Sequence, residues 1–73
     1  MIEKNLKNRI KSLRLLNQKM TQEQLSQKVG VSRQTISAIE SGKKSPSLLC
    51  AMGIAESLNT PLEEVFFRSN QSD

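Results

Sequence analysis

A strip of short side chains between residues 32 and 41 has the chemistry to read the edges of DNA base pairs. Arg33 can donate two hydrogen bonds to a guanine, and the amide of Gln34 can bond twice to an adenine. The Ser37 hydroxyl can donate or accept, and the methyl of Ala38 can meet that of a thymine. On a helix, steps of one and four residues place these side chains on one face. We therefore predict base contacts from Ser32, Arg33, Gln34, Ser37 and Ala38.

A second set of residues has the chemistry to hold DNA phosphates, which position a protein on the duplex without reading its sequence. Gln22 would open a helix before the strip, where free backbone N–H groups and the helix dipole attract an anion. Lys43 and Lys44 follow the strip, although two lysines beside a helix end can also simply complement its negative dipole. We predict phosphate contacts from Gln22, Ser41, Lys43 and Lys44, whereas Thr35 should face partly inward.

The elements that would carry these residues are two short helices joined by a tight turn. Leu25 and Val29 are four residues apart, and Ile36 and Ile39 are three apart, so each pair lies on one helical face. Gly30 lies between the two pairs and can take the left-handed conformation that ends a helix. Both apolar faces are therefore expected to turn inward.

Polar residues at the expected helix ends support this arrangement. Thr21 can cap the first helix, with Gln24 three residues later to complete a capping box. Ser32 can cap the second helix, which is predicted over Ser32 to Ser41, and Gly42 can end it. This is the helix-turn-helix pattern, in which the second helix lies in the DNA major groove.

The segment before this pair, Asn5 to Gln18, is predicted to be a basic amphipathic helix. Its apolar residues recur at intervals of three or four, at Leu6, Ile10, Leu13 and Leu16, with Met20 beyond. Leu15 falls outside this stripe and should be partly exposed. A basic amphipathic helix can also lie on an anionic membrane, but here the stripe has a core to join.

After the pair, a loop that ends at Pro46 leads to a helix from about Ser47 to Leu58, which Asn59 should end. Its predicted buried side consists of Leu48, Ala51, Met52, Ile54, Ala55 and Leu58. Cys50 is expected to pack as a small apolar residue.

A last helix is predicted up to about Phe66. Thr60 would be its cap, Pro61 its first residue and Glu63 the partner in a capping box. We expect one domain over residues 1–68 and a disordered tail over residues 69–73.

Together these motifs resemble the lambda-repressor/Cro-type family, also called the xenobiotic response element family, over roughly residues 6–66. The matching residues are Thr21-Gln22, Leu25, Gly30-Val31-Ser32, Ile36, Glu40, Gly42, Pro46-Ser47-Leu48, Ile54-Ala55, Leu58 and Leu62-Glu63-Glu64-Val65-Phe66. The resemblance implies an all-α, five-helix fold, double-stranded DNA as the partner, and a backbone phosphate as the partner of Gln22.

The resemblance also raises two structural questions. In similar short repressors, a strand after the last helix joins N-terminal residues, which implies a short β element from Phe66–Arg68 and Met1–Glu3. Family members commonly pair an Arg, seven residues before the Gln of the second helix, with a Glu of the recognition helix. Here Arg14 lies eight residues before Gln22, so the first helix or its loop contains one extra residue, and pairing of Arg14 with Glu40 is left open.

Composition excludes several other classes of protein. The chain has 73 residues, one cysteine and no histidine, which argues against an internal disulfide framework, a zinc site and catalysis by a Ser-His or Cys-His pair. No apolar run approaches the roughly 18 residues that cross a bilayer. We expect a cytoplasmic protein that is not an enzyme and has no cofactor, metal or small-molecule ligand. Residues 1–44 carry ten Lys/Arg and three Glu, whereas residues 45–73 carry one Arg and four acids. This uneven charge favours binding of a polyanion to one face of the molecule.

The expected function is regulation of transcription, most simply as a repressor that binds a two-fold operator as a homodimer. Leu49, Phe66 and Phe67 are apolar and otherwise unassigned, so we predict that they form the dimer interface, with Phe66 turned inward and Phe67 toward the partner. A DNA-binding antitoxin is an alternative, but it would need a longer disordered tail than residues 69–73 to wrap around its toxin. A protein-interaction module on the same scaffold is a second alternative, but it would lack the basic face.

Overall fold

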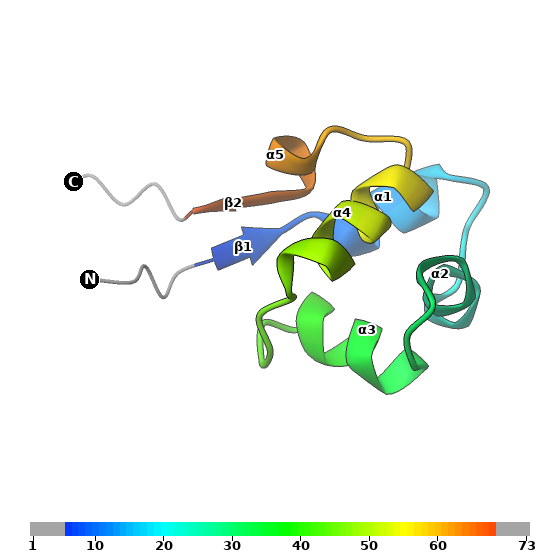
Figure 1. Cartoon of the computed structure of the whole chain (residues 1–73). Coiled ribbons are helices and arrows are strands. Elements are labelled where there is room, and N and C mark those ends of the chain that lie inside the picture. Colours follow the sequence, from blue (N-terminus) through cyan, green and yellow to red (C-terminus); the bar gives the residue numbers. More distant parts are fainter. Residues whose placement is uncertain (1–5, 69–73) are drawn as a thin grey trace.

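Seven elements follow one another along residues 6–68, the part of the chain that the computed structural model describes. In order they are β1 (Leu6–Asn8), α1 (Ile10–Leu16), α2 (Gln22–Val29), α3 (Arg33–Glu40), α4 (Leu48–Ser57), α5 (Leu62–Val65) and β2 (Phe66–Arg68). The five helices pack together, and the two strands pair beside them (Figure 1). The predicted five-helix fold with a short β element is therefore confirmed, while the predicted tail, residues 69–73, lies outside the described residues. Within residues 6–68, no helix combines the length and the apolar character needed to cross a membrane.

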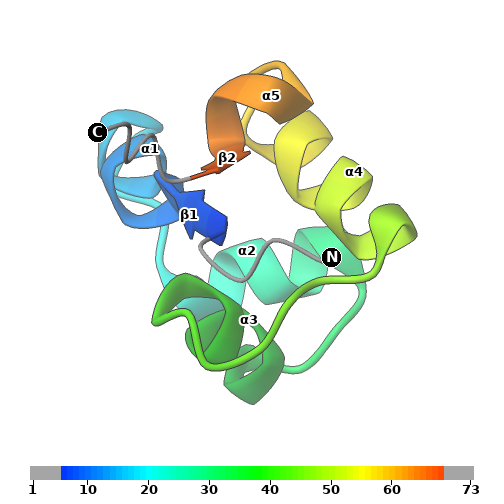
Figure 2. The ribbon, with the colours of Figure 1, turned by 90° about the vertical axis from the view of Figure 1, so that its left-hand side faces the viewer.

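The core receives side chains from all five helices. Its fully buried members are Ile10, Leu25, Ile36, Ile39, Ile54, Leu58 and Val65. Each such side chain contributes about 1.5–3 kcal/mol relative to an exposed one, so helices too short to be stable alone hold one another in place. In both views α3 lies at the bottom of the molecule and α5 at the top (Figure 2).

The ends of α2 and the start of α3 form as their sequence predicts. Thr21 Oγ1 accepts a hydrogen bond from the Gln24 N–H at 3.0 Å, and Gln24 Oε1 accepts one from the Thr21 N–H at 2.9 Å, which completes the capping box. Ser32 Oγ accepts a hydrogen bond from the Thr35 N–H at 3.1 Å and so caps α3. Gly30 ends α2 in the left-handed conformation, with φ at 90°.

The helix predicted over Asn5 to Gln18 is wrong in its first part. Leu6–Asn8 is a strand that pairs antiparallel with β2, and α1 begins only at Ile10. The Asn8 side chain accepts a hydrogen bond from the Ile10 N–H at 3.1 Å, which favours a helix start at that point. Residues 6–8 pair instead with β2, which lies far away in the sequence. The spacing of apolar residues within one segment cannot reveal such a pairing.

The apolar stripe of that predicted helix is only partly buried. Ile10 is buried as expected, but Leu16 and Leu6, which now lies in β1, are exposed. Leu15 is exposed too, which confirms its place outside the stripe. On the last turn of α1 the buried position is occupied by Arg14. The apolar part of its side chain can pack in the core while its guanidinium forms hydrogen bonds.

The loop between α1 and α2 has an unusual backbone. Gln18 and Lys19 both have left-handed backbones, with φ of 61° and 56°, which is costly for residues other than glycine. The next residue, Met20, is held by Arg14 through two bonds of 2.9 Å: its N–H donates to the Arg14 carbonyl, and its carbonyl accepts from Arg14 Nη1. These two bonds hold the end of the loop against the last turn of α1.

The buried side of α4 is narrower than predicted. Its buried residues, as expected, include Ala51, Ile54, Ala55 and, just beyond its last turn, Leu58. Leu48 and Met52, also predicted to be buried, are 69% and 44% exposed. On a helix both lie next to exposed Leu49, so these three residues form an outward apolar surface, called here the outer strip of α4. Cys50 is half-buried against the core, and its burial raises the pKa of its thiol.

The predicted cap of α5 is also wrong. Pro61, not Thr60, occupies the N-cap position, with φ −58° and ψ 145°, and the helix starts after it. The Thr60 hydroxyl instead donates to the Leu58 carbonyl at 2.9 Å, so the capping box with Glu63 does not form. Asn59 follows α4 with a left-handed φ of 54°, in agreement with its predicted role at the end of that helix.

The strand predicted over Phe66–Arg68 is present as β2. Its partner among the described residues is β1, in the register Leu6 to Arg68, Lys7 to Phe67 and Asn8 to Phe66. The predicted partner, Met1–Glu3, lies outside the described residues. Successive residues of a strand face opposite ways, so Phe66 packs against the core while the Arg9 guanidinium lies 4.6 Å from the ring centre of Phe67.

Candidate nucleic-acid interface

The structure brings the predicted base-contact residues together at the start and on the outer side of α3: Ser32, Arg33, Gln34, Ser37 and Ala38. The first three are exposed, and the two that lie one turn further on are half-buried. Ile36 and Ile39 hold the opposite side of the helix in the core. The strip is therefore carried by a fixed element at one edge of the molecule (Figure 1).

Within this strip, Ser32 also has a structural task. Its hydroxyl accepts from the Thr35 N–H and lies 2.9 Å from the Thr35 hydroxyl, with which it shares a second hydrogen bond. Thr35 is half-buried, as expected. Because Ser32 is engaged in starting α3, the exposed side chains of Arg33 and Gln34 are better placed to bind a ligand.

A buried ion pair fixes α3 to α1. Arg14 Nε donates to Glu40 Oε2 at 3.0 Å and Arg14 Nη2 donates to Glu40 Oε1 at 3.2 Å, while the side chains are only 9% and 10% exposed. The pairing of Arg14 with Glu40, which the sequence leaves open, is therefore formed. It has the bidentate geometry that is typical of a guanidinium and a carboxylate. Removal of either partner would leave a buried charge alone, so the pair resists movement of α3 against α1.

Gln22, a predicted phosphate ligand, joins this ion pair. Its Nε2 donates to Glu40 Oε1, which holds the first residue of α2 beside the last residue of α3. The amide nitrogen carries two hydrogens, so one remains for another acceptor. Glu23 places a carboxylate in the same turn, where Gln27 Nε2 donates to it at 3.2 Å, and this charge opposes an anion nearby.

The loop after α3 folds back over the end of that helix. The N–H groups of Lys43 and Lys44 both donate to the Ala38 carbonyl, at 2.9 Å and 3.1 Å, and the Ser41 hydroxyl donates to it at 3.2 Å. Gly42 permits the reversal with a φ of 84°. Both lysines are exposed, and their backbone lies at the end of α3, where positive charge complements the negative end of the helix dipole and can attract a phosphate.

Sequence reasoning missed three side chains that position these helices. Asn8 Nδ2 donates to the carbonyls of the last two residues of α3, at 3.1 Å and 3.4 Å. Asn17 Nδ2 donates to the Leu58 carbonyl at 3.0 Å, and Arg9 Nη1 donates to the Glu64 carbonyl at 3.2 Å. Asn8 carries a usable signal, an Asn two residues before an apolar helical run. The other two bonds join residues 41 and 55 positions apart, which no local pattern reveals.

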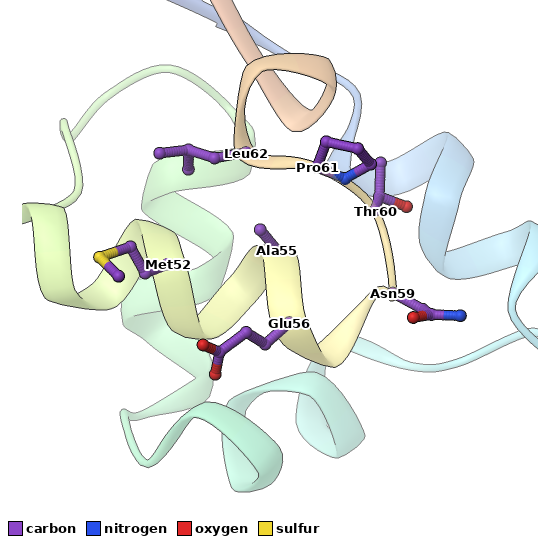
Figure 3. Close-up of a pocket in the computed structure, with 7 residues that line it drawn as sticks. All are labelled: Met52, Ala55, Glu56, Asn59, Thr60, Pro61 and Leu62. Carbon is purple, nitrogen blue, oxygen red and sulfur yellow. The ribbon is translucent and has the colours of Figure 1, made fainter.

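The residues predicted for a dimer interface lie on α4 and β2. Leu49 is exposed, and Phe66 and Phe67 are half-buried. Beside the outer strip is a hollow between α4 and α5 (Figure 3), lined by Met52, Ala55, Glu56, Asn59, Thr60, Pro61 and Leu62. The outer strip is thus an exposed apolar surface, and the hollow beside it also has polar lining residues, Glu56, Asn59 and Thr60.

A capped helix, a glycine turn and a second, exposed helix held by a buried ion pair define the class of helix-turn-helix domains. A family model described as helix-turn-helix matches residues 10–65. The chain therefore belongs to the lambda-repressor/Cro-type helix-turn-helix family, which comprises DNA-binding regulators of transcription.

Curated relatives and a solved structure are similar over most of the chain. An uncharacterized HTH-type transcriptional regulator from Methanocaldococcus jannaschii is 49% identical over 61 residues, which cover 84% of this chain and 91% of that protein. A second one, YgzD from Bacillus subtilis, is 40% identical over 67 residues, covering 92% of this chain and 100% of that protein. The crystal structure of a candidate DNA-binding protein from Bacteroides fragilis is 34% identical, with a TM-score of 0.72, and the match covers 85% of this chain and 98% of that one.

Proposed function

We propose that this chain is a sequence-specific repressor of transcription that reads the major groove of double-stranded DNA with α3. The observation that carries the proposal is the exposure of Arg33 and Gln34 on the first turn of α3. In helix-turn-helix proteins the N-terminal residues of the second helix contact base edges. Because the Arg14–Glu40 pair holds the other end of α3, these two side chains are presented from a fixed position.

The roles along the strip follow from the chemistry of each side chain. Arg33 would donate two hydrogen bonds to a guanine and Gln34 would bond twice to an adenine. Ser37 and Ala38 would add a hydroxyl and a methyl contact one turn along the groove. Ser32 would contribute chiefly by capping α3, since its hydroxyl is already bound to Thr35.

The phosphate contacts would fall to residues at the C-terminal end of α3. Lys43 and Lys44 are exposed there, next to Ser41. Gln22 is close to the same end because its amide is bound to Glu40. Neutralising phosphates releases bound counterions, so this part of the binding should weaken as salt increases.

A homodimer on a two-fold operator supplies the contact area that one small domain lacks. We place its interface on Leu49, Phe66 and Phe67, extended by the rest of the outer strip and the hollow beside it (Figure 3). Exposed apolar surface of this kind is stabilised when a second copy covers it. The two copies of α3 should then lie about 34 Å apart, one turn of DNA. Such a dimer excludes other proteins from the base pairs that it covers, so repression needs no further contact.

Selection of bound duplexes from a random pool tests this function. The wild type should enrich one two-fold sequence, and Gln34→Ala should lose about 1–3 kcal/mol on that sequence and relax the preference at one base pair. Lys43→Ala is the control, because it should weaken binding to all duplexes alike and lower the salt slope by about 1. A wild type that enriches no sequence would overturn the proposal, and an unchanged preference in Gln34→Ala would overturn the assigned reading face.

A further inference from the structure

Asn8 lies where the terminal sheet, the start of α1 and the end of α3 meet. It is the last residue of β1 and pairs there with Phe66. Its Oδ1 accepts a hydrogen bond from the Ile10 N–H at 3.1 Å. Its Nδ2 donates to the carbonyls of Ile39 and Glu40, at 3.1 Å and 3.4 Å. One half-buried side chain thus connects three elements.

The amide group is suited to this place because it donates and accepts at once. The partners on α3 are carbonyls, which need a donor, and the partner on α1 is an N–H, which needs an acceptor, so the orientation of the amide is determined. Carbonyls in the last turn of a helix have no partner within the helix. The Ile39 carbonyl already accepts from the Gly42 N–H at 3.1 Å, and Asn8 can bind to its second lone pair.

We propose that Asn8 is a positioning residue for DNA recognition, which holds the C-terminal end of α3 against the terminal sheet and so sets the angle at which α3 enters the groove. This inference rests on the proposed function. The Arg14–Glu40 pair and Gln22 tie the same end of α3 to α1 and α2, whereas Asn8 ties it to β1. Gln34 lies six residues before Glu40, or roughly 9 Å along the helix, so a tilt at the end of α3 moves the base-reading groups.

An isosteric change separates this role from that of starting α1. In Asn8→Asp the carboxylate can still accept from the Ile10 N–H, because Asp makes this local turn as readily as Asn. It can no longer donate to α3, and its charge faces two carbonyls at the negative end of the helix. The start of α1 is kept, and the bonds to α3 are lost.

The measured quantity is the ratio of affinities for the selected operator and for a random duplex of equal length. A fall in the folded fraction weakens both affinities by the same factor and leaves this ratio unchanged. A role in positioning α3 lowers the ratio, because base contacts are disturbed while phosphate contacts remain. We expect Asn8→Asp to lower it about tenfold, the size of one good base contact.

Two further variants control for charge and for folding. Ser12→Asp adds the same charge at an exposed site on α1 and should weaken both affinities alike. Asn8→Ser adds no charge, keeps a hydroxyl for the Ile10 N–H and is too short to reach α3, so it should lower the ratio as well, including where Asn8→Asp fails to fold. A selective wild type whose ratio is unchanged in a folded Asn8→Asp and in Asn8→Ser overturns the role of Asn8 alone. A wild type that selects no sequence overturns the proposed function and this inference together.

Discussion

The helix-turn-helix and the terminal part of the molecule are built by different means. Between residues 21 and 42, the helix caps and turns are formed by neighbours in the sequence, such as the Thr21–Gln24 capping box and the left-handed Gly30. The terminal part depends on distant partners, since β1 pairs with β2 and Asn17 binds the carbonyl of Leu58. Local signals therefore form the reading surface, and long-range contacts set how it is held.

Removal of Glu40 should have the largest effect, because the Arg14–Glu40 pair links α1 to α3 and is buried. In Glu40→Ala the Arg14 guanidinium stays buried without its anion, and Gln22 loses its acceptor. We expect the free energy of unfolding to fall by about 3–5 kcal/mol, measured by urea denaturation.

A double variant distinguishes the lone charge from the lost contact. Arg14→Met with Glu40→Leu removes both charges and fills the space with apolar groups, which often restores stability. It should therefore be clearly more stable than Glu40→Ala. A single variant within about 1 kcal/mol of the wild type would mean that the two regions are held together by apolar packing instead.

The difference between the regions also explains what could be predicted from the sequence. The strip on α3, its cap and both glycine turns were predictable, because residues three or four apart specify them. For β1 the sequence wrongly predicts a helix, because Leu6 and Ile10 keep a helical spacing although Leu6 pairs across to Arg68. Similarly, the spacing of Leu16 predicts burial, but the buried position on the last turn of α1 is occupied by Arg14, whose partner lies 26 residues away.

The exposed apolar surface offers the next comparison, because it should be covered in a dimer. Leu49 and Leu16 are both 81% exposed, but only Leu49 belongs to the proposed interface. Leu49→Glu should weaken the dimer by at least about 2 kcal/mol, roughly 30-fold in Kd, because a charge would be buried without a partner. The same change at Leu16 should leave the dimer intact. Sedimentation of both variants tests this, and a dimer that weakens equally in both would contradict the proposed interface.

A smaller effect is expected at the two glycines that terminate α2 and α3. Gly30 and Gly42 have φ of 90° and 84°, and a Cβ at either position would meet no other atom within 4 Å. An alanine there is strained by its backbone alone, so each variant should lose on the order of 1 kcal/mol or slightly more in thermal melts. Equal losses at both sites would support local encoding of the whole helix-turn-helix, whereas an unchanged melting temperature at Gly30 would show that the turn tolerates a side chain.

Gly53 should respond in the opposite direction, although the substitution is the same. It lies inside α4, and an added Cβ would be 3.4 Å from Val29 Cγ1 on α2, an ordinary contact distance. Alanine restricts the unfolded chain and favours the helix, so Gly53→Ala should raise the free energy of unfolding by about 0.5–1 kcal/mol. Gly53→Val should lose this gain, because its branched side chain favours the helix less and has to displace Val29. A loss of stability already in Gly53→Ala would show that α2 and α4 pack too closely for a methyl group, and that this glycine, unlike Gly30 and Gly42, is required by a long-range contact.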